Sequence, residues 1–129
     1  MKKEIIRTER APQPAGSYSQ AVKYGNLVYV AGTCPFELGS KTVMYPGDMA
    51  RQTTLVLEYI GKILEDAGSS MDNVLKVTAF IDDLDRFAEY DAAYAPFFAN
   101  DPPVRSTVEI GKFPAGMRVE IECIAFIGD

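Results

Sequence analysis

The sequence predicts an α+β fold in which two helices pack on one face of a mixed β-sheet. Three observations favour this fold class. Segments with the alternation of β-strands lie at both ends of the chain, two helical stripes interrupt them, and one central segment is apolar on both faces. The length of 129 residues and the hydrophobic content of 47% fit one globular domain over residues 1–129.

The first part of the chain is expected to form three strands. Ile5–Arg7 is a short first strand, and Gly25-Asn26 is the two-residue signature of a tight hairpin turn. That turn joins Ser19–Tyr24 to Leu27–Ala31. A weaker β-type excursion follows, formed by Phe36–Leu38 and Thr42–Met44.

A long amphipathic helix is predicted next. Asp48 suits the N-cap position, and Gly68 suits the position just after the last turn. The helical stripe consists of Met49, Thr53, Val56, Leu57, Ile60, Ile63, Leu64 and Ala67.

The remaining elements are a strand, a second helix and a closing hairpin. Val74–Ile81 is apolar on both faces, which predicts an internal strand. Asp83 or Asp85 caps the second helix, and Pro96 is expected to kink or shorten its last turn. Its stripe is Leu84, Phe87, Asp91, Tyr94 and Phe98. Ser106–Ile110 and Arg118–Ile127, on either side of a Gly/Pro loop, are expected to pair as a hairpin.

One face of this sheet has no predicted cover. In the last strand one face is apolar throughout, and the other begins with Arg118, Glu120 and Glu122 and ends with Ile124 and Phe126. Two helices cover one face of a sheet, so the other face needs a different partner. We therefore expect a homo-oligomer that buries the free face against neighbouring subunits.

The composition restricts the possible chemistry. The chain has no histidine, which removes His-dependent triads and the commonest metal ligand. A net charge of −5 disfavours nucleic acid as a partner. No apolar run is long enough for a membrane span, and MKKEIIRTER is not a signal peptide. With only Cys34 and Cys123, a disulfide framework is not expected, and we expect a cytoplasmic protein.

Several short motifs resemble those of the RidA (YjgF) family over nearly the whole chain, from Ala11 to Ala125. The most specific combination is Arg105-Ser106 with Glu120-Ile121-Glu122. The others are Gly16-Ser17-Tyr18, Tyr29-Val30-Ala31-Gly32-Thr33, Phe97-Phe98 and Pro103-Val104. The resemblance implies a chorismate-mutase-like fold and a homotrimer with three clefts between subunits. It also implies hydrolysis of enamines and imines, such as 2-aminoacrylate, 2-iminopropanoate or 2-iminobutanoate, to 2-oxo acids and ammonia.

The residues themselves fit this chemistry. Arg105 can grip the carboxylate of a 2-imino acid with two hydrogen bonds, and Glu120 can orient and partly deprotonate a water molecule. A protonated imine is already electrophilic, so neither a metal nor another cofactor is expected. Backbone groups around Gly32 and Thr107 would hold the imine nitrogen, and Tyr18 would form a wall of the pocket.

Each candidate residue also has a simpler interpretation. Arg105 could be a surface arginine that pairs with Glu109 or Glu122, Glu120 a solvated acid at a strand edge, and Tyr18 a core aromatic residue. Cys34 is close enough in sequence to touch the cleft, although free cysteines usually serve packing.

Two positions depart from the family pattern. Asp91 stands where the family commonly has asparagine, and an isolated charge on an apolar stripe is costly. Asp91 either lies where the apolar stripe reaches solvent or faces the site. In the site it would neutralise part of the charge of Arg105 or select a substrate with an extra hydrogen-bond donor. Thr107 stands where many relatives carry cysteine, which removes thiol chemistry there.

Three other functions remain as alternatives. The chain could form a ligand-sensing or protein-binding trimer without turnover, or a related deaminase that acts on an amino-dienoate. A nuclease or translation inhibitor, a label that some family members have carried, is disfavoured by the acidic charge and the lack of histidine.

Overall fold

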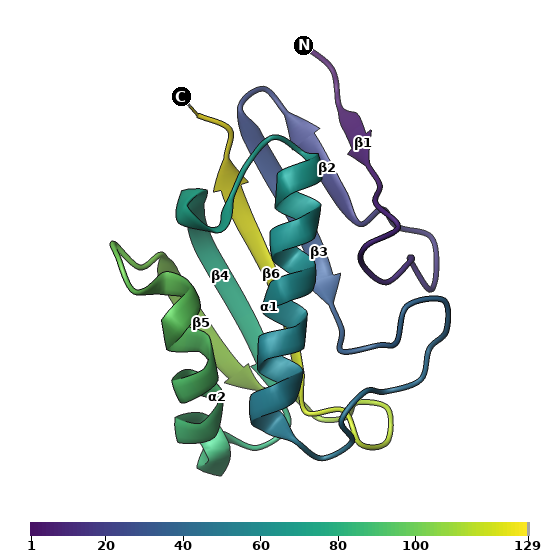
Figure 1. The fold of residues 1–129 in the computed structure, drawn as a ribbon, viewed down its shortest axis with the longest axis vertical. Helices are drawn as coiled ribbons and strands as arrows, with labels where there is room; N and C mark the ends of the chain where they lie inside the picture. Colours follow the sequence, from purple (N-terminus) through teal and green to yellow (C-terminus); the bar gives the residue numbers. More distant parts are fainter. Residues whose placement is uncertain (129) are drawn as a thin grey trace.

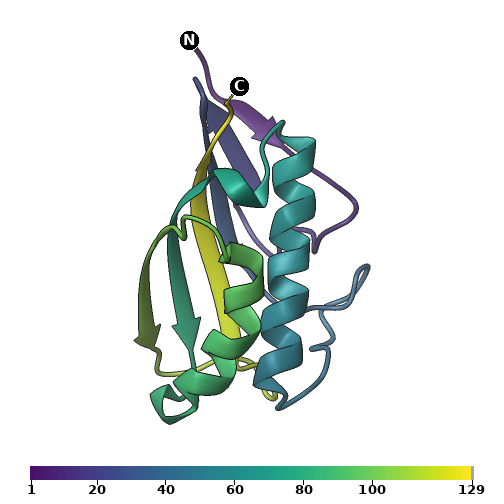
Figure 2. The same cartoon turned by 60° about the vertical axis from the view of Figure 1, so that its left-hand side comes forward.

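A six-stranded sheet in the order β1-β2-β3-β6-β4-β5 forms the frame of the computed structural model, which describes residues 1–128 (Figure 1). Both helices lie on the same side of this sheet (Figure 2), so the predicted α+β class is confirmed. The strands are β1 (Glu4–Ile6), β2 (Ala21–Tyr24), β3 (Leu27–Thr33), β4 (Val74–Ile81), β5 (Val104–Glu109) and β6 (Val119–Phe126), and the helices are α1 (Met49–Asp66) and α2 (Phe87–Tyr94).

The predicted hairpin between the last two strands is wrong. β5 pairs in parallel with β4 at the edge of the sheet, whereas β6 lies between β3 and β4 and is antiparallel to both. Pairing along both sides of β6 leaves no place there for β5. The Gly/Pro loop after β5 therefore passes across the end of β4 instead of making a tight turn.

The sequence signals of the first half are confirmed with small shifts in their ends. β2 and β3 form the expected hairpin, and Gly25 in its turn has a φ of 62°, in the left-handed region that glycine tolerates. β1 begins and ends one residue earlier than predicted. The weak excursion is reduced to one isolated bridge between Phe36 and Val43.

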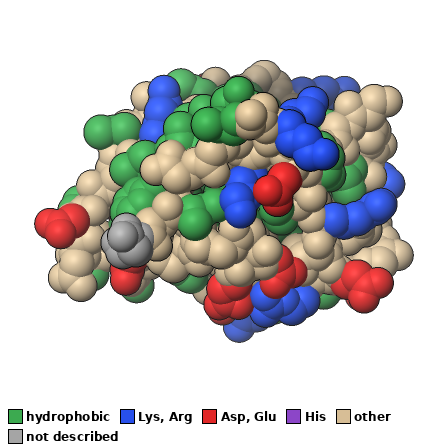
Figure 3. Space-filling model, turned by 90° about the horizontal axis from the view of Figure 1, so that it is seen from above, with side chains coloured by type: hydrophobic (Ala, Val, Ile, Leu, Met, Phe, Trp, Pro, Cys, Tyr) green, Lys and Arg blue, Asp and Glu red, His purple; other side chains and the backbone are tan. Residues whose placement is uncertain are grey.

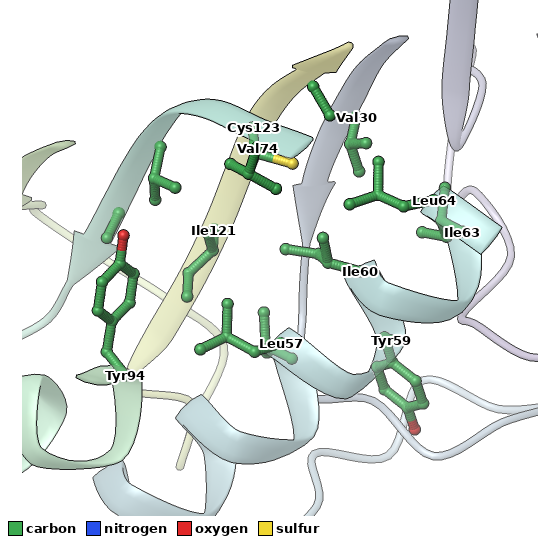
Figure 4. Packing of buried hydrophobic residues seen from close by; sticks show 14 of the residues in the cluster. Val30, Leu57, Tyr59, Ile60, Ile63, Leu64, Val74, Tyr94, Ile121 and Cys123 are labelled. Atoms are coloured by element: carbon green, nitrogen blue, oxygen red, sulfur yellow. The ribbon is translucent and has the colours of Figure 1, made fainter. Parts of the chain in front are cut away.

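Helix α1 has the predicted caps and supplies most of the core. Asp48 accepts a hydrogen bond from the backbone N–H of Arg51 at 3.0 Å, and Gly68 follows the helix with a φ of 86°. Leu57 and Ile60 point from α1 toward Ile121 of β6 (Figure 4). Complete burial of such side chains contributes about 1.5–3 kcal/mol each, so this stripe holds α1 against the centre of the sheet.

Helix α2 is shorter than its sequence pattern predicts. It lies between two 3-10 helices, Leu84–Arg86 and Ala95–Phe98, so the shortened last turn expected at Pro96 is confirmed. Of the two predicted caps, Asp83 is the one that accepts from the N–H of Asp85, at 2.9 Å.

The buried face of this segment differs from the predicted stripe. Tyr90, Tyr94 and Phe98 are buried, but Leu84 is 45% exposed and Asp91 lies at the rim. The buried residues Tyr90, Tyr94 and Phe98 are spaced by four, so the buried face is centred on them. Asp91 is one residue further along the helix than Tyr90, about 100° around its axis, and therefore lies beside this face.

The second face of the sheet is uncovered, as predicted. Tyr24, Tyr29, Val104 and Val108 are all exposed, and their strand partners place them on the face opposite the helices. The end view of the molecule shows acidic and basic side chains around a group of hydrophobic ones (Figure 3). Within residues 1–128, no helix combines the length and the apolar character needed to cross a membrane.

Candidate active site

Arg105 belongs to the edge strand β5, and its side chain lies on the helix side of the sheet. Its register partner is the buried Val77 of β4, which faces the helices. The guanidinium carbon lies 4.5 Å from the centroid of the Tyr94 ring and 5.4 Å from that of Tyr90. A third ring, Phe87, lies at 5.3 Å. Cation–π contacts with these rings hold the guanidinium against α2.

Asp91 forms an ion pair with this arginine. The distance from Arg105 Nη1 to Asp91 Oδ1 is 2.8 Å, and the two side chains are 22% and 45% exposed. Burial opposes the charge on Arg105, but the hydrogen bond to Asp91 and the nearby tyrosines outweigh it, so the pKa of Arg105 is raised. Neither Glu109 nor Glu122 makes an ion pair with Arg105 in the part of the chain that the structure describes.

Three hydroxyl groups beside Arg105 are buried without a partner. Among residues 1–128, the hydroxyl oxygens of Tyr90, Tyr94 and Thr107 make no hydrogen bond. Burial raises the pKa of Tyr90, and that of Tyr94 to about 12, so both hydroxyls keep their protons at neutral pH. A buried hydroxyl without a partner costs about 1–3 kcal/mol. The hydroxyls of Tyr90 and Thr107 are near enough to each other, and those of both tyrosines near enough to Arg105, to interact, so these groups form a buried polar cluster under the guanidinium.

A cavity of about 700 Å³ opens next to this cluster. Both Asp91 and Arg105 line it, so the ion pair is accessible to a ligand. Its other walls come from the end of α2 and the turn before β5: Ala92, Tyr94, Ala95, Pro96, Phe98, Ala99, Pro102 and Pro103. We call Arg105, Asp91, Tyr90, Tyr94 and Thr107, with this cavity, the arginine pocket.

Glu120 lies on the opposite face of the sheet. Its register partner in β4 is Phe80, three residues from Val77, and strand residues an odd number apart face opposite ways. The carboxylate packs over the backbone of Gly32, where an added Cβ would overlap Glu120 Oε2. Glycine at position 32 therefore gives the carboxylate room for this close approach, and its backbone angle is not the reason for it.

The surroundings of Glu120 make it a stronger base than an ordinary glutamate. Burial raises its pKa, a hydrogen bond from the Cys34 thiol partly offsets this, and the charge of Glu122 raises it further. Burial and the Glu120 carboxylate raise the pKa of Cys34 to about 12, so its thiol stays protonated. Within one subunit the sheet separates Glu120 from Arg105, and this guanidinium is not among the groups that shift the pKa of Glu120.

Tyr18 belongs to the neighbourhood of Gly32. Tyr18, Gly32 and Cys34 line a small cavity of about 30 Å³. The Tyr18 ring is 52% exposed, and its hydroxyl accepts a hydrogen bond from the N–H of Ala15 at 3.1 Å. Tyr18 is therefore not a core aromatic residue, and its exposed ring is free to touch a neighbour. We call Glu120, Gly32, Cys34 and Tyr18 the glutamate group.

The sequence-predicted site residues thus fall into two separate sets. Arg105, Asp91 and Thr107 lie together in the arginine pocket, and Glu120, Gly32 and Tyr18 lie in the glutamate group. The sequence did not indicate the role of Tyr90, although its spacing of three residues from Phe87 and four from Tyr94 is that of one helix face. In residues 1–128 no three Cys, Asp or Glu side chains are grouped closely enough to hold a metal ion.

Comparisons with known proteins place this chain in one family. The model of the family described as Endoribonuclease L-PSP matches residues 8–127. A RutC family protein of Pyrococcus abyssi is 42% identical over 126 residues, which cover 98% of each chain. The chloroplastic Reactive Intermediate Deaminase A of Arabidopsis thaliana is 37% identical over 97% of this chain and 66% of its own. The crystal structure of Escherichia coli TdcF with bound serine has a TM-score of 0.87 and 36% identity, covering 95% of this chain and 98% of that one.

Proposed function

Since the chain belongs to the endoribonuclease L-PSP family, which includes RutC and RidA proteins, we propose that it is a deaminase for reactive 2-imino acids. The reaction is R–C(=NH₂⁺)–COO⁻ + H₂O → R–CO–COO⁻ + NH₄⁺, with 2-iminopropanoate or 2-iminobutanoate as typical substrates. The chloroplastic relative is named a reactive intermediate deaminase, which supports this class of reaction.

The observation that carries the proposal is the arginine pocket. Arg105 is charged, it is held by aromatic rings, and among residues 1–128 only Nη1 of its guanidinium makes a side-chain hydrogen bond. The remaining N–H groups are available for the carboxylate of a 2-imino acid. Each such charge-assisted hydrogen bond contributes about 1.5–3 kcal/mol. Tyr94, whose ring lies against the guanidinium, lines the same cavity.

We further propose that the complete site forms between subunits of a homotrimer. Arg105 and Glu120 lie on opposite faces of one sheet, so one chain cannot present both groups to one small substrate. Tyr29, Val104 and Val108 leave an apolar face without cover, and burial against a neighbour would remove it from water. In this arrangement the arginine pocket of one subunit meets the glutamate group of the next.

Glu120 is the group that we propose to act on water. Its raised pKa makes it a better proton acceptor than an ordinary carboxylate, and a carboxylate that accepts a hydrogen bond also orients the water. Attack of that water on the iminium carbon forms a new C–O bond, and Glu120 takes the proton. Return of this proton to the nitrogen breaks the C–N bond and releases ammonia as the C=O bond forms, and the hydroxyl proton passes through Glu120 to ammonia, which leaves as NH₄⁺.

A ligand-binding trimer without turnover is the alternative. Asp91 occupies one nitrogen of Arg105, which lowers the net charge that the pocket offers to a carboxylate. The E. coli relative is described with serine bound, an amino acid rather than a reactive imine. A related deaminase that acts on an amino-dienoate would use the same groups on a longer substrate.

A coupled assay separates these functions. A pyridoxal-phosphate serine dehydratase generates 2-aminoacrylate from serine, which becomes 2-iminopropanoate, and the rate of pyruvate formation is followed with and without this protein. The proposal requires faster appearance of pyruvate in proportion to the protein added. A rate equal to that of spontaneous hydrolysis, in a preparation that binds pyruvate or serine, would favour the binding trimer.

A further inference from the structure

We infer that Asp91 makes the arginine pocket selective for zwitterions, ligands that carry a cationic nitrogen on the carbon next to their carboxylate. Iminium forms of 2-imino acids and ordinary 2-amino acids belong to this class, whereas 2-oxo acids do not. The inference rests on the proposed role of Arg105 as a carboxylate ligand and adds to it a basis for distinguishing substrate from product.

The ion pair of Arg105 and Asp91 leaves both partners with unused binding capacity. Its one close contact joins Nη1 to Oδ1 at 2.8 Å. Within residues 1–128, neither the other guanidinium nitrogens nor Asp91 Oδ2 takes part in a side-chain hydrogen bond. A carboxylate can therefore bind Arg105 without displacing Asp91, and a cation beside that carboxylate can reach Oδ2.

Helix α2 holds both Arg105 and Asp91 in position. Tyr90 is fully buried and Tyr94 is 5% exposed, so the helical turn that carries Asp91 is anchored on both sides. Tyr94 points from α2 toward the sheet (Figure 4), and its ring lies under the guanidinium at 4.5 Å. Asp91 itself is 45% exposed and lines the cavity. The acid is thus fixed at the rim, where a ligand enters.

The charges decide which ligand the pocket favours. Arg105 and Asp91 together are neutral, so a 2-oxo acid would bring an uncompensated negative charge into a half-buried site next to Asp91. Like charges at such distances repel in a medium of reduced dielectric constant. An iminium or ammonium nitrogen cancels the added charge and donates to Asp91 Oδ2. A lone anion would bind Arg105 more tightly if position 91 carried no charge.

This selectivity suits a hydrolase. The substrate enters as the iminium zwitterion, and the product leaves as a simple anion that Asp91 repels. The released 2-oxo acid therefore competes weakly with fresh substrate. Asp91 acts as a specificity residue that touches the ligand nitrogen, separate from the group that we propose to activate water.

The test compares two ligands with the same carbon skeleton, L-alanine and pyruvate. Dissociation constants are measured by NMR titration of the assembled protein, for the natural chain and for Asp91→Asn. We expect the natural chain to bind L-alanine at least about tenfold more tightly than pyruvate, and Asp91→Asn to lose about tenfold of that preference, mostly through tighter binding of pyruvate. Asp91→Ser removes the same charge with a smaller side chain, so the conclusion does not depend on how one variant folds.

Glu89→Gln is the matched control. Glu89 lies on the same helix, is 49% exposed, and pairs with Arg86 at 2.9 Å rather than with Arg105. This variant removes the same charge from the chain, and it should keep the ligand preference unchanged.

The possible failures are distinguishable. Equal or tighter binding of pyruvate by the natural chain, or an unchanged preference in Asp91→Asn and Asp91→Ser, would overturn the inference while leaving the carboxylate role of Arg105 intact. If neither ligand bound, the proposed function would lose its support, and this inference would fail with it.

Discussion

Arg105 and Glu120 project from opposite faces of one sheet, because their partners in β4, Val77 and Phe80, are three residues apart. The arginine faces the helices and the glutamate faces the uncovered side. Any reaction that needs both groups must therefore bring two chains together.

Mixing two inactive variants should restore activity. Arg105→Ala chains keep Glu120, and Glu120→Gln chains keep Arg105, so sites that combine one intact residue from each chain form only between subunits. With random assembly into trimers, about a quarter of the sites contain both intact residues. The variants are unfolded together, refolded, and assayed for imine hydrolysis against each variant refolded alone.

No recovery after mixing would argue against a site shared between chains. Sedimentation of the natural protein provides a separate check, since a 14.2 kDa species at micromolar concentration would contradict the trimer.

Substitution of Arg105 should remove most of the activity. We expect Arg105→Ala to lower kcat/KM by roughly two orders of magnitude or more, because two charge-assisted hydrogen bonds to the carboxylate are lost. Arg105→Lys should also be poor, since an ammonium group cannot reproduce the planar fork. Steady-state kinetics in the coupled assay measure both. Near-normal rates in the two variants would show that the substrate carboxylate is held elsewhere.

Glu120→Gln should separate binding from turnover. The amide keeps the shape and one hydrogen-bonding oxygen but cannot accept the proton, so we expect a folded protein that binds pyruvate normally and hydrolyses imines much more slowly. NMR titration and the coupled assay measure these two properties. Weaker pyruvate binding with an unchanged rate at saturation would instead identify Glu120 as a substrate ligand.

The pH dependence of the rate should report the environment of Glu120. Burial raises the pKa of this carboxyl, and a base works only when ionised. The rate should therefore fall, as the pH decreases, at a higher pH than the usual glutamate value of about 4.3. The hydrogen bond from Cys34 lowers the pKa, so Cys34→Ala should move the acid limb to still higher pH.

Cys34→Ser keeps a donor at the same place and serves as the control for that shift. An acid limb at the same pH in Cys34→Ala and the natural chain would contradict the role of the thiol.

Gly32→Ala should impair activity more than stability. The added Cβ overlaps Glu120 Oε2, which is the mobile end of a side chain, so the carboxylate can move aside while the strand stays in place. We expect a small change in Tm and a fall in rate of about tenfold or more, since small displacements of a catalytic group are costly. Gly111→Ala is the matched control, because open space surrounds a Cβ there. A normal rate in Gly32→Ala would mean that the position of this carboxylate is unimportant.

Local patterns in the sequence were sufficient to predict most elements. The turn at Gly25-Asn26, the cap at Asp48 and the strand Val74–Ile81 each depend on residues that are close in the chain, and all three are present. Turn chemistry and the period of apolar residues act over a few residues, so the order of the elements can be derived without knowledge of the pairing.

Strand pairing and the position of the site were decided only by the tertiary structure. β6 is apolar on one whole face and on the far half of the other, and it pairs along both edges with β3 and β4 instead of forming a hairpin with β5, which buries its fully apolar face under the helices. Parallel pairing with β4 places Arg105 on the helix side, and the alternation along β6 places Glu120 on the open side. The sequence by itself singled out Arg105, Asp91 and Glu120 as candidates for the chemistry. Their grouping depends on contacts between distant segments, which the residues near each of them in sequence do not encode.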